Sequence, residues 1–369
     1  MDRKQEILRR LSDAEDFVSG QELCSELQVS RTAVWKIIRK LKAEGYPIEA
    51  VTNKGYRLLS VDEADVFNHD TICRNLSTEW AGRPLIFREE TGSTNDDVFA
   101  FAAEGYPHGT LAVASRQTSG KGRRGRNWVS PQDGNIYMSI LLKPDIRPEC
   151  APMLTVVMAL SVYQAVQDLL PSQPASLPHS DSQPNNGLDP NPYPSSASEK
   201  EQTDSRFGIK WPNDIVASAN GGPFRKLCGI LTEMRMEDND ISAITIGVGL
   251  NVNQTVFEPE IAEIATSVSL TLGKQINRAA LTAAIWKYFE KNYRIFTSTC
   301  DFSGLRKLYE EGLVNRGRAV HVLDPVSPFT GTALGINDRG ELLVRPDHGG
   351  PVRAIGTGEV SVRGVAGYV

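Results

Sequence analysis

The sequence predicts an α+β protein built from three units: an N-terminal winged helix-turn-helix, a central mixed α/β domain and a small C-terminal β-barrel. Residues 1–62 contain two capped helices followed by a hairpin pattern. Residues 65–312 mix strands and helices without regular alternation, and residues 313–369 hold five short apolar runs. The length of 369 residues suits two or three domains of ordinary size.

The composition is that of a folded cellular protein. Hydrophobic residues make up 40% of the chain and charged residues 23%, which excludes collagen, long coiled coils and wholesale disorder. No apolar run approaches 18 residues and the N-terminus is charged, so we expect neither a membrane span nor a signal peptide. Five scattered cysteines favour the reducing cytoplasm over a disulfide framework or a cysteine zinc site.

Helix-start signals mark the first unit. Ser19 and Glu22 have the spacing of a capping box, and Ser30 is a good N-cap for a second helix. Gly45 lies where this helix would end, and residues 48–59 read as a hairpin. Four apolar residues fall on one face of the second helix, namely Val34, Ile37, Ile38 and Leu41. This order of elements predicts a winged helix-turn-helix.

The same unit carries a local excess of positive charge. From Arg31 to Arg57 there are seven Lys or Arg against two Glu, a local net of +5 in a chain whose net charge is −5. Such cations can neutralise phosphates while the start of a helix enters a major groove. The alternative is a solvated helical face. We predict DNA binding through Arg31, Thr32, Lys36, Arg39, Lys40 and Lys54.

The central unit contains six runs with strand character, Pro84–Arg88, Thr110–Ser115, Asn135–Leu142, Phe207–Trp211, Leu227–Met234 and Ser242–Val252. Helical patterns cover Asp96–Glu104, Ala151–Leu170, Arg278–Phe296 and Ser303–Glu310. This irregular order favours a mixed sheet over a doubly wound one. Residues 171–205 interrupt the pattern with seven prolines and eight serines, which predicts a disordered insert. We expect it to be inert, because long surface insertions cost little closure entropy.

The last unit has short apolar runs separated by turn residues. That spacing is typical of a small β-barrel. The runs are Ala319–Leu323, Thr330–Leu334, Leu342–Val344, Val352–Ile355 and Val360–Val362.

The most informative stretch is residues 119–126, Ser-Gly-Lys-Gly-Arg-Arg-Gly-Arg. Its glycines have dinucleotide-fingerprint spacing, but no helix pattern opens there and no acidic residue follows about twenty positions on. A P-loop is excluded because Arg126-Asn127 stands where Lys-Ser/Thr is required. The remaining interpretations are a basic surface patch, or a flexible loop that grips phosphate or carboxylate oxygens through Lys121, Arg123, Arg124 and Arg126.

Four further polar features could serve a site or be ordinary structure. Asn213 and Asp214, in Lys-Trp-Pro-Asn-Asp, could contact a nucleotide or Mg²⁺, although an Asn-Asp turn is more common. Lys226, which begins an apolar strand, could clamp a phosphate or be a solvated strand end. Asn251 is an unusual residue for a core strand, and Ser93 before a helix could be only an N-cap.

In combination these motifs resemble those of the biotin protein ligases. They occur in the family's order as Ser93-Thr-Asn95, Gln117-x-x-Gly-Lys-Gly-Arg-Arg-Gly-Arg-x-Trp128, Lys210-Trp-Pro-Asn-Asp214, Lys226-x-x-Gly-Ile-Leu231 and Gly247-x-Gly-x-Asn251. With the winged N-terminus and Gly358-Glu-Val-Ser-Val-Arg363, the chain resembles the bifunctional bacterial ligases that also repress the biotin operon. The resemblance covers the chain apart from residues 171–205.

The resemblance implies two half-reactions. Biotin and MgATP form biotinyl-5′-AMP and pyrophosphate, and a lysine of a biotin carrier protein then takes the biotin. Lys226 and Arg123 would be the catalytic cations between the biotin carboxylate and the α-phosphate, because joining two anions requires positive charge between them. The biotin site would consist of Ser93, Thr94, Asn95, Gln117, Lys121, Gly122, Arg123 and Lys226. Trp128, Asn213, Asp214 and Asn251 would bind the nucleotide, with Asp214 as a Mg²⁺ ligand.

The resemblance also implies an SH3-like barrel at the C-terminus, a ligand-linked homodimer and operator DNA as a partner. Lys121 stands where some relatives have arginine, so it keeps the charge but loses the planar fork. Two alternatives remain. One is a transcriptional sensor that binds biotin or its adenylate without ligation, and the other is a lipoate-type ligase, whose members do not normally carry this basic loop with the Trp-Pro-Asn-Asp sequence.

Overall fold

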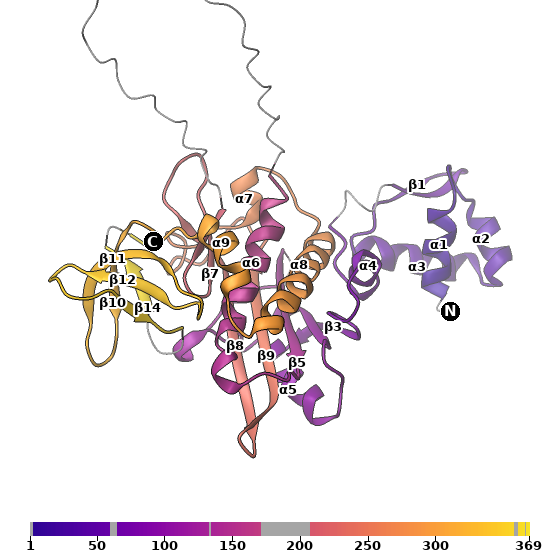
Figure 1. The fold of residues 1–369 in the computed structure, drawn as a ribbon. Helices are drawn as coiled ribbons and strands as arrows, with labels where there is room; N and C mark the ends of the chain where they lie inside the picture. Colours follow the sequence, from indigo (N-terminus) through magenta and orange to yellow (C-terminus); the bar gives the residue numbers. More distant parts are fainter. Residues whose placement is uncertain (1–2, 60–64, 133, 171–206, 358–360, 366) are drawn as a thin grey trace, which may run out of the picture.

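The structure is a computed structural model that describes residues 3–59, 65–132, 134–170, 207–357, 361–365 and 367–369. The insert predicted at 171–205 lies outside the described residues. Figure 1 shows three parts in chain order, a small helical unit at one end, a central sheet flanked by helices, and a C-terminal sheet at the other end.

The N-terminal unit has the predicted helix-turn-helix and hairpin, preceded by a further helix. Its elements are α1 (Arg3–Ser12), α2 (Gly20–Leu27), α3 (Arg31–Ala43), β1 (Ile48–Val51) and β2 (Gly55–Leu58). Ser19 Oγ and Ser30 Oγ accept from the main chain three residues on, as predicted for N-caps. The carboxylate of Glu22 pairs with Arg10 of α1, so only the serine half of the predicted capping box is formed among the described hydrogen bonds.

This unit has a hydrophobic core of its own. Ile7, Leu23, Val34 and Leu41 are almost fully buried in a cluster separate from that of the rest of the chain. The helix stripe predicted from the sequence therefore faces inward, and the charged side of α3 faces solvent.

The central unit is a mixed seven-stranded sheet, as predicted. Only β3 and β4 pair in parallel among the described strands, and every other neighbouring pair is antiparallel. The strand β7 is an addition to the predicted elements. In sheet order the strands are β3 (Leu85–Thr91), β4 (Leu111–Gln117), β5 (Asn135–Leu142), β9 (Asp240–Asn251), β8 (Arg225–Glu237), β7 (Asp214–Ala217) and β6 (Phe207–Lys210).

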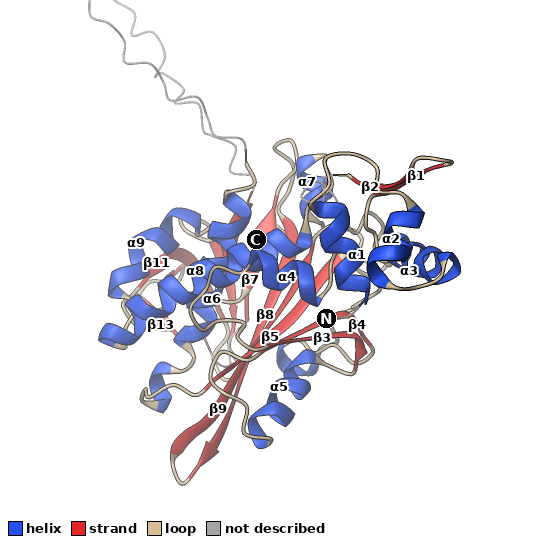
Figure 2. Cartoon of the chain, turned by 90° about the vertical axis from the view of Figure 1, so that its right-hand side faces the viewer, coloured by secondary structure: helices blue, strands red, loops and turns tan. Residues whose placement is uncertain are grey.

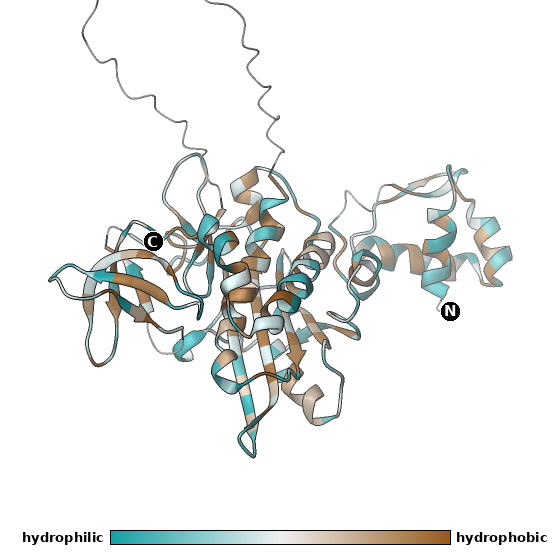
Figure 3. Cartoon of the chain, viewed as in Figure 1, coloured by the Kyte–Doolittle hydropathy of each residue, from teal (hydrophilic) through white to brown (hydrophobic). Residues whose placement is uncertain are grey.

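Helices cover both faces of the sheet (Figure 2). The helix α5 (Thr94–Ala103) packs on one face, where it buries Val98 and Phe101 against Ala112. The opposite face is covered by α4 (His69–Asn75), α6 (Met153–Gln167), α8 (Arg278–Thr299) and α9 (Ser303–Gly312), and α7 (Val268–Leu272) follows β9. All eight residues of β5 are buried because both of its faces are covered. Apolar segments accordingly run along the central strands, α6 and α8 (Figure 3).

Among the described residues, one helical stretch meets the length and mean hydropathy of a membrane span. Pro148–Gln167 has a mean hydropathy of 1.4 over its most apolar window, and 78% of that window is buried inside the fold. Thr155 and Ser161 interrupt the apolar run but lower its mean hydropathy only a little. The stretch contains α6, the core helix on which the sheet packs.

The C-terminal unit is an antiparallel sheet that shares its hydrophobic core with the central unit. Its strands, in the sheet order β13-β12-β11-β10-β14, are β10 (Ala319–Leu323), β11 (Phe329–Ile336), β12 (Leu342–Pro346), β13 (Arg353–Ile355) and β14 (Ser361–Gly364). Trp211 Nε1 donates to the Gly340 carbonyl at 2.8 Å, which ties the turn after β6 to this sheet. The described pairings place β13 and β14 at its edges, so closure into a barrel stays a prediction.

Candidate active site and DNA-binding surface

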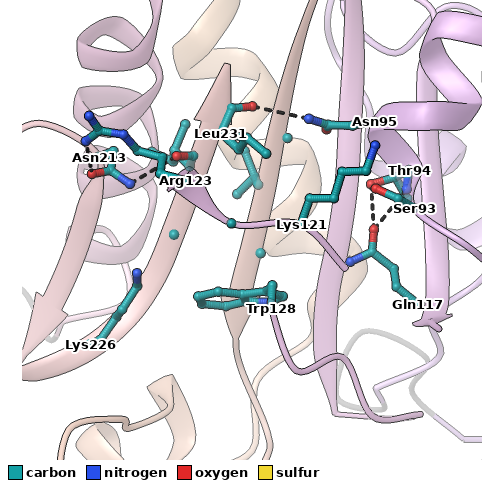
Figure 4. Close-up of a pocket in the computed structure, with 16 residues that line it drawn as sticks. Ser93, Thr94, Asn95, Gln117, Lys121, Arg123, Trp128, Asn213, Lys226 and Leu231 are labelled. Carbon is teal, nitrogen blue, oxygen red and sulfur yellow. Dashed lines mark hydrogen bonds between the residues drawn. The ribbon is translucent and has the colours of Figure 1, made fainter. Parts of the chain in front are cut away.

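The candidate active site begins at the carboxyl ends of the parallel strands. Ser93 and Thr94 follow β3, and Gln117 ends β4, where ligands commonly bind in α/β sheets. All eight residues of the predicted biotin site line one cavity here, together with Trp128 and Asn213 (Figure 4). The tertiary fold thus brings together side chains from separate segments of the chain, from Ser93 to Lys226.

A chain of hydrogen bonds orders the polar end of this cavity. Thr94 N and Thr94 Oγ1 donate to Gln117 Oε1 at 2.9 and 3.0 Å. Asn95 Oδ1 accepts from Ser139 Oγ at 2.6 Å, and Asn95 Nδ2 donates to Glu233 Oε2 at 2.6 Å. Thr94 and Asn95 are only 3% exposed. Their donors and acceptors are therefore oriented before any ligand arrives, which suits recognition of a polar ring.

Glycines on the paired strands β8 and β9 make room for two site side chains. A Cβ on Gly247 would lie 2.2 Å from Asn95 Oδ1, and one on Gly249 would lie 2.4 Å from Trp128 Nε1. A Cβ on Gly229, opposite Gly249 in the ladder, would lie 2.8 Å from the indole. These glycines therefore form a floor on which Asn95 and Trp128 lie.

Trp128 fills much of the cavity. The free volume there is only about 40 Å³, room for a few water molecules and too little for biotin. The indole Nε1 is buried and has no hydrogen-bond partner among the described residues. An unpartnered buried donor in a site is costly, which favours either a ligand acceptor or a displaced indole in the working state.

The glycine-rich loop forms a closed turn over the cavity. Trp128 N donates to the Gly120 carbonyl at 2.9 Å, and Gly122 N donates to the Arg126 carbonyl at 2.7 Å. Arg123 reaches inward, where its guanidinium donates to Asn213 Oδ1 at 2.9 Å and to the Thr357 carbonyl at 2.7 Å. Burial lowers the pKa of this guanidinium from its ordinary value, although an arginine stays protonated.

Lys121 pairs with Asp96 at the start of α5. Arg124 and Arg126 are exposed. Of the four cations in the loop, Arg123 is thus the least exposed, while Arg124 and Arg126 line a cleft towards the C-terminal unit from the outside.

A β-bulge directs Lys226 into the site. In the ladder between β7 and β8, Ile215 pairs with Cys228 but Val216 pairs with Lys226, so one extra residue lies in β8. Without the bulge, Lys226 would share a face with Cys228, away from Gly229. The Lys226 main chain bonds instead to residues 264–266.

A second cleft of about 550 Å³ adjoins the first cavity. Arg123, Asn213, Trp128 and Lys226 line both, so the two share a boundary. Asp214 lies in the second cleft, where its Oδ1 is 2.8 Å from Lys226 Nζ and its Oδ2 accepts from the Tyr368 hydroxyl at 2.7 Å.

The charges in this cleft perturb one another. Burial opposes ionisation of Asp214, but Lys226 and Lys210 outweigh it and lower the pKa of that carboxyl. Burial, helped by Lys226, Arg363 and Arg126, lowers the pKa of Lys210 to about 8, although Asp214 opposes this. Cations outnumber carboxylates here, which suits phosphates.

The Asp214 carboxylate fits a counter-ion better than a resident metal ligand. Both of its oxygens are already engaged by Lys226 and Tyr368. The described residues contain no group of three His, Cys, Asp or Glu that could hold a metal ion. Magnesium often binds through one or two carboxylates plus substrate phosphates, so any Mg²⁺ here would be held mainly by a nucleotide.

Asn251 lies outside both cavities. Its side chain is 6% exposed and donates to the Thr266 carbonyl at 3.1 Å, beneath the segment that anchors Lys226. The structure thus brings together every predicted site residue except Asn251.

Several residues that order the site were not among the predicted ones. Ser139 and Glu233 order Asn95, and Lys210 and Tyr368 surround Asp214. Lys210 could have been noticed as a charged residue ending a buried strand. No sequence pattern places Tyr368 beside Asp214, which is 154 residues away.

The candidate DNA-binding surface lies on α3 and the hairpin. All six predicted residues, Arg31, Thr32, Lys36, Arg39, Lys40 and Lys54, are exposed. Trp35, which was not predicted, is 51% exposed on the same helix, with the Arg39 guanidinium 5.5 Å from its ring centroid. A groove of about 640 Å³ separates α3 from the hairpin. These features suit a helix in a major groove flanked by a wing.

Comparison with known proteins agrees with this geometry. Residues 89–251 match the model of the "Biotin/lipoate A/B protein ligase family", residues 3–57 match "HTH domain", and residues 317–363 match "Biotin protein ligase C terminal domain".

Two curated relatives match this chain along most of its length. The chain is 36% identical to the "Bifunctional ligase/repressor BirA" of Bacillus subtilis, over 90% of this chain and 91% of that protein. It is 25% identical to the protein of the same name from Escherichia coli, over 94% of each. Among solved structures, the biotin protein ligase of Aquifex aeolicus in complex with biotin and ATP is 27% identical, with a TM-score of 0.57, over 76% of this chain and 98% of that one.

Proposed function

This chain belongs to the family of bifunctional biotin protein ligase/repressors, and from that premise we propose how its residues divide the work. Residues 65–312 form the catalytic domain, residues 1–62 bind operator DNA and residues 313–369 complete the nucleotide side of the site. The substrates are biotin and ATP, and the acceptor is a lysine of a biotin carrier protein. The reaction takes place in the cytoplasm, where ATP is available.

One observation carries the catalytic proposal. Lys226 and Arg123 line both cavities, and the two cavities differ in chemistry. The first has ordered neutral donors and acceptors around Thr94 and Asn95, which suit the biotin ureido group. The second has the cationic surroundings of Asp214, which suit the phosphates of ATP. A carboxylate in the first and a phosphate in the second would meet at the shared cations.

The chemistry at that boundary needs no protein nucleophile. A biotin carboxylate oxygen attacks the α-phosphorus of ATP, an acyl–phosphate bond forms, and pyrophosphate leaves. Lys226 and Arg123 neutralise the charge that accumulates on the phosphoryl oxygens. The amine of the carrier lysine then attacks the acyl carbon, and AMP leaves as the amide forms.

The loop that carries Trp128 moves when biotin binds. The cavity in its present form is too small for biotin, and the unpartnered indole lies over the glycine floor. We propose that Trp128 and Asn213 bind the nucleotide. Asp214 holds the Lys226 side chain in place. A loop that closes over the adenylate would also exclude water from a hydrolysable anhydride.

Repression follows from the exposed cations of α3 and the hairpin. These residues would contact operator phosphates, and a homodimer that forms on adenylate binding would present two such helices to a palindromic operator. An electrophoretic shift on the chain's own upstream promoter, with and without biotin plus ATP, tests this part. An electrophoretic shift of the same size with and without biotin plus ATP would contradict ligand-dependent repression.

Incubation with ATP, biotin and an acceptor domain tests the ligase. The purified chain should exchange pyrophosphate into ATP only when biotin is present, and it should transfer biotin to the acceptor lysine. A sensor without ligation would bind biotin but leave the acceptor unmodified, and a lipoate-type ligase would accept lipoate in parallel assays.

A further inference from the structure

The segment that follows β14 reaches the catalytic cleft. Tyr368 lies beside Asp214 and Lys210, which belong to the hairpin of β6 and β7. Its hydroxyl donates to Asp214 Oδ2 at 2.7 Å, and the Lys210 ammonium is 3.5 Å from the centroid of its ring. One tyrosine therefore contacts an anion and a cation of the cleft at once.

The position of Tyr368 is held by its neighbours. A Cβ on Gly364 would lie 2.1 Å from the main chain of Val369, so the segment folds back closely on the end of β14. Val369 itself is only 9% exposed. Burial raises the pKa of the Tyr368 hydroxyl well above its ordinary value, so it remains a neutral donor.

The Asp214 carboxylate has two candidate cationic partners, Lys226 and Lys210. It pairs with Lys226 through Oδ1, while Oδ2 is taken by the tyrosine hydroxyl. The ring at the same time faces Lys210, where a cation–π contact stabilises the ammonium. If the hydroxyl were lost, Oδ2 would be free to turn towards Lys210, and the carboxylate would no longer hold Lys226 in one place.

We propose that Tyr368 is a positioning residue for adenylate formation, which acts through Asp214 to place the Lys226 ammonium at the boundary of the two cavities. This inference rests on the proposed ligase function. It makes the C-terminal unit part of the first half-reaction. The effect should fall mainly on ATP. Lys226 also faces the biotin carboxylate, but the other biotin residues, around Thr94 and Asn95, make no hydrogen bond to Tyr368 among the described ones.

Biotin-dependent pyrophosphate exchange tests the proposal with Tyr368→Phe. This change removes one hydroxyl and keeps the ring beside Lys210. The value of kcat/KM for ATP should fall at least about tenfold, the size expected for one hydrogen bond to a charged group, while the KM for biotin should stay within about twofold of wild type. Tyr368→Leu, which also loses the ring, should lose more.

Tyr309→Phe is the matched control. Tyr309 is also buried, but its hydroxyl has no hydrogen-bond partner among the described residues, so its removal should leave both KM values unchanged. Asp214→Asn combined with Tyr368→Phe provides a second test. The double variant should be no slower than Asp214→Asn alone, because the tyrosine acts through that carboxylate.

Three outcomes would overturn the inference while the wild-type chain remains an active ligase. They are ATP kinetics of Tyr368→Phe within twofold of wild type, equal losses for ATP and biotin, and additive losses in the double variant. A wild-type chain that fails to exchange pyrophosphate and to biotinylate an acceptor would overturn the ligase proposal itself.

Discussion

The ammonium of Lys226 lies 2.8 Å from the carboxylate of Asp214, at the boundary between the cavity assigned to biotin and the cleft assigned to ATP. The two side chains are 26% and 12% exposed, so the pair is partly shielded from solvent. An ammonium held there by one carboxylate is already oriented when a phosphate arrives. The binding of the phosphate therefore does not have to supply the free energy that would order the lysine side chain.

Lys226→Ala should abolish biotin-dependent pyrophosphate exchange, with a loss of at least about a hundredfold, because it removes the cation that would face both reacting anions. It also leaves the Asp214 carboxylate without its nearest cation, so we expect the free energy of unfolding to fall by roughly 1–3 kcal/mol. Thermal melts and exchange assays measure the two effects. Lys274→Ala, which removes an exposed lysine of the same unit, is the control. Unchanged exchange in Lys226→Ala would remove the main catalytic assignment.

Two neighbouring glycines should separate the biotin side from the nucleotide side. Gly247→Ala puts a methyl group 2.2 Å from Asn95 Oδ1 and should raise the KM for biotin at least tenfold. Gly249→Ala puts one 2.4 Å from Trp128 Nε1 and should raise the KM for ATP instead. Steady-state kinetics with each substrate varied in turn distinguishes the two.

Gly20→Ala is the control for these glycines, because its new methyl group would meet only the Tyr56 ring at an ordinary 3.6 Å. Both KM values should stay at the wild-type level in that variant. If Gly247→Ala and Gly249→Ala affected the same substrate, the division of the site would be wrong.

The activity should depend on pH through Lys210. Burial is the main cause that lowers its pKa to about 8 in the folded chain, so it loses its charge as pH rises through about 8. The value of kcat/KM for ATP, which reports on the free enzyme, should fall above that pH. Lys210→Arg keeps the positive charge, so kcat/KM for ATP should no longer fall above pH 8 in that variant. If kcat/KM for ATP still fell above pH 8 in Lys210→Arg, another titrating group would be the cause.

The same shift has the opposite sign for stability. Between pH 8 and the ordinary lysine pKa of 10.5, the unfolded chain binds more protons at Lys210 than the folded one. The contribution of Lys210 to the free energy of unfolding should therefore increase as the pH rises from 8 to 10.5. Comparison of the wild type with Lys210→Met in denaturant titrations at pH 7.5 and 10 measures the difference.

DNA affinity should depend steeply on salt through α3. Lys36→Ala and Lys40→Ala should each weaken binding and reduce the slope of log K against log salt by about 0.9, the value for one phosphate contact. Ligation should be unchanged, since the N-terminal unit has a core of its own. Lys274→Ala again serves as the matched control. A wild-type slope in both variants would mean that these lysines face away from DNA.

Much of the fold follows from local patterns. The stripe of Val34, Ile38 and Leu41 predicted the buried face of α3, and Ser30 predicted its start. The mixed sheet was predicted from irregular alternation of strands and helices. The helices α1, α4 and α7 and the strand β7 were missed. The last three have only seven, five and four residues, which leaves little periodicity to detect, whereas the buried stripe of Ile7, Leu8 and Leu11 could have revealed α1.

The sequence by itself determined which residues could do the chemistry: a glycine-rich cationic loop, a lysine that begins an apolar strand, and a polar tripeptide at a helix start. Residue type and short-range order are enough for that, since they depend only on the local chain. The tertiary structure alone decided how these groups meet. An extra residue in β8 turns Lys226 to the face of Gly229, and the return of the chain after β14 brings Tyr368 to Asp214. The bulge depends on the register between β7 and β8, and the tyrosine contact joins residues 154 positions apart; no local pattern records either of them.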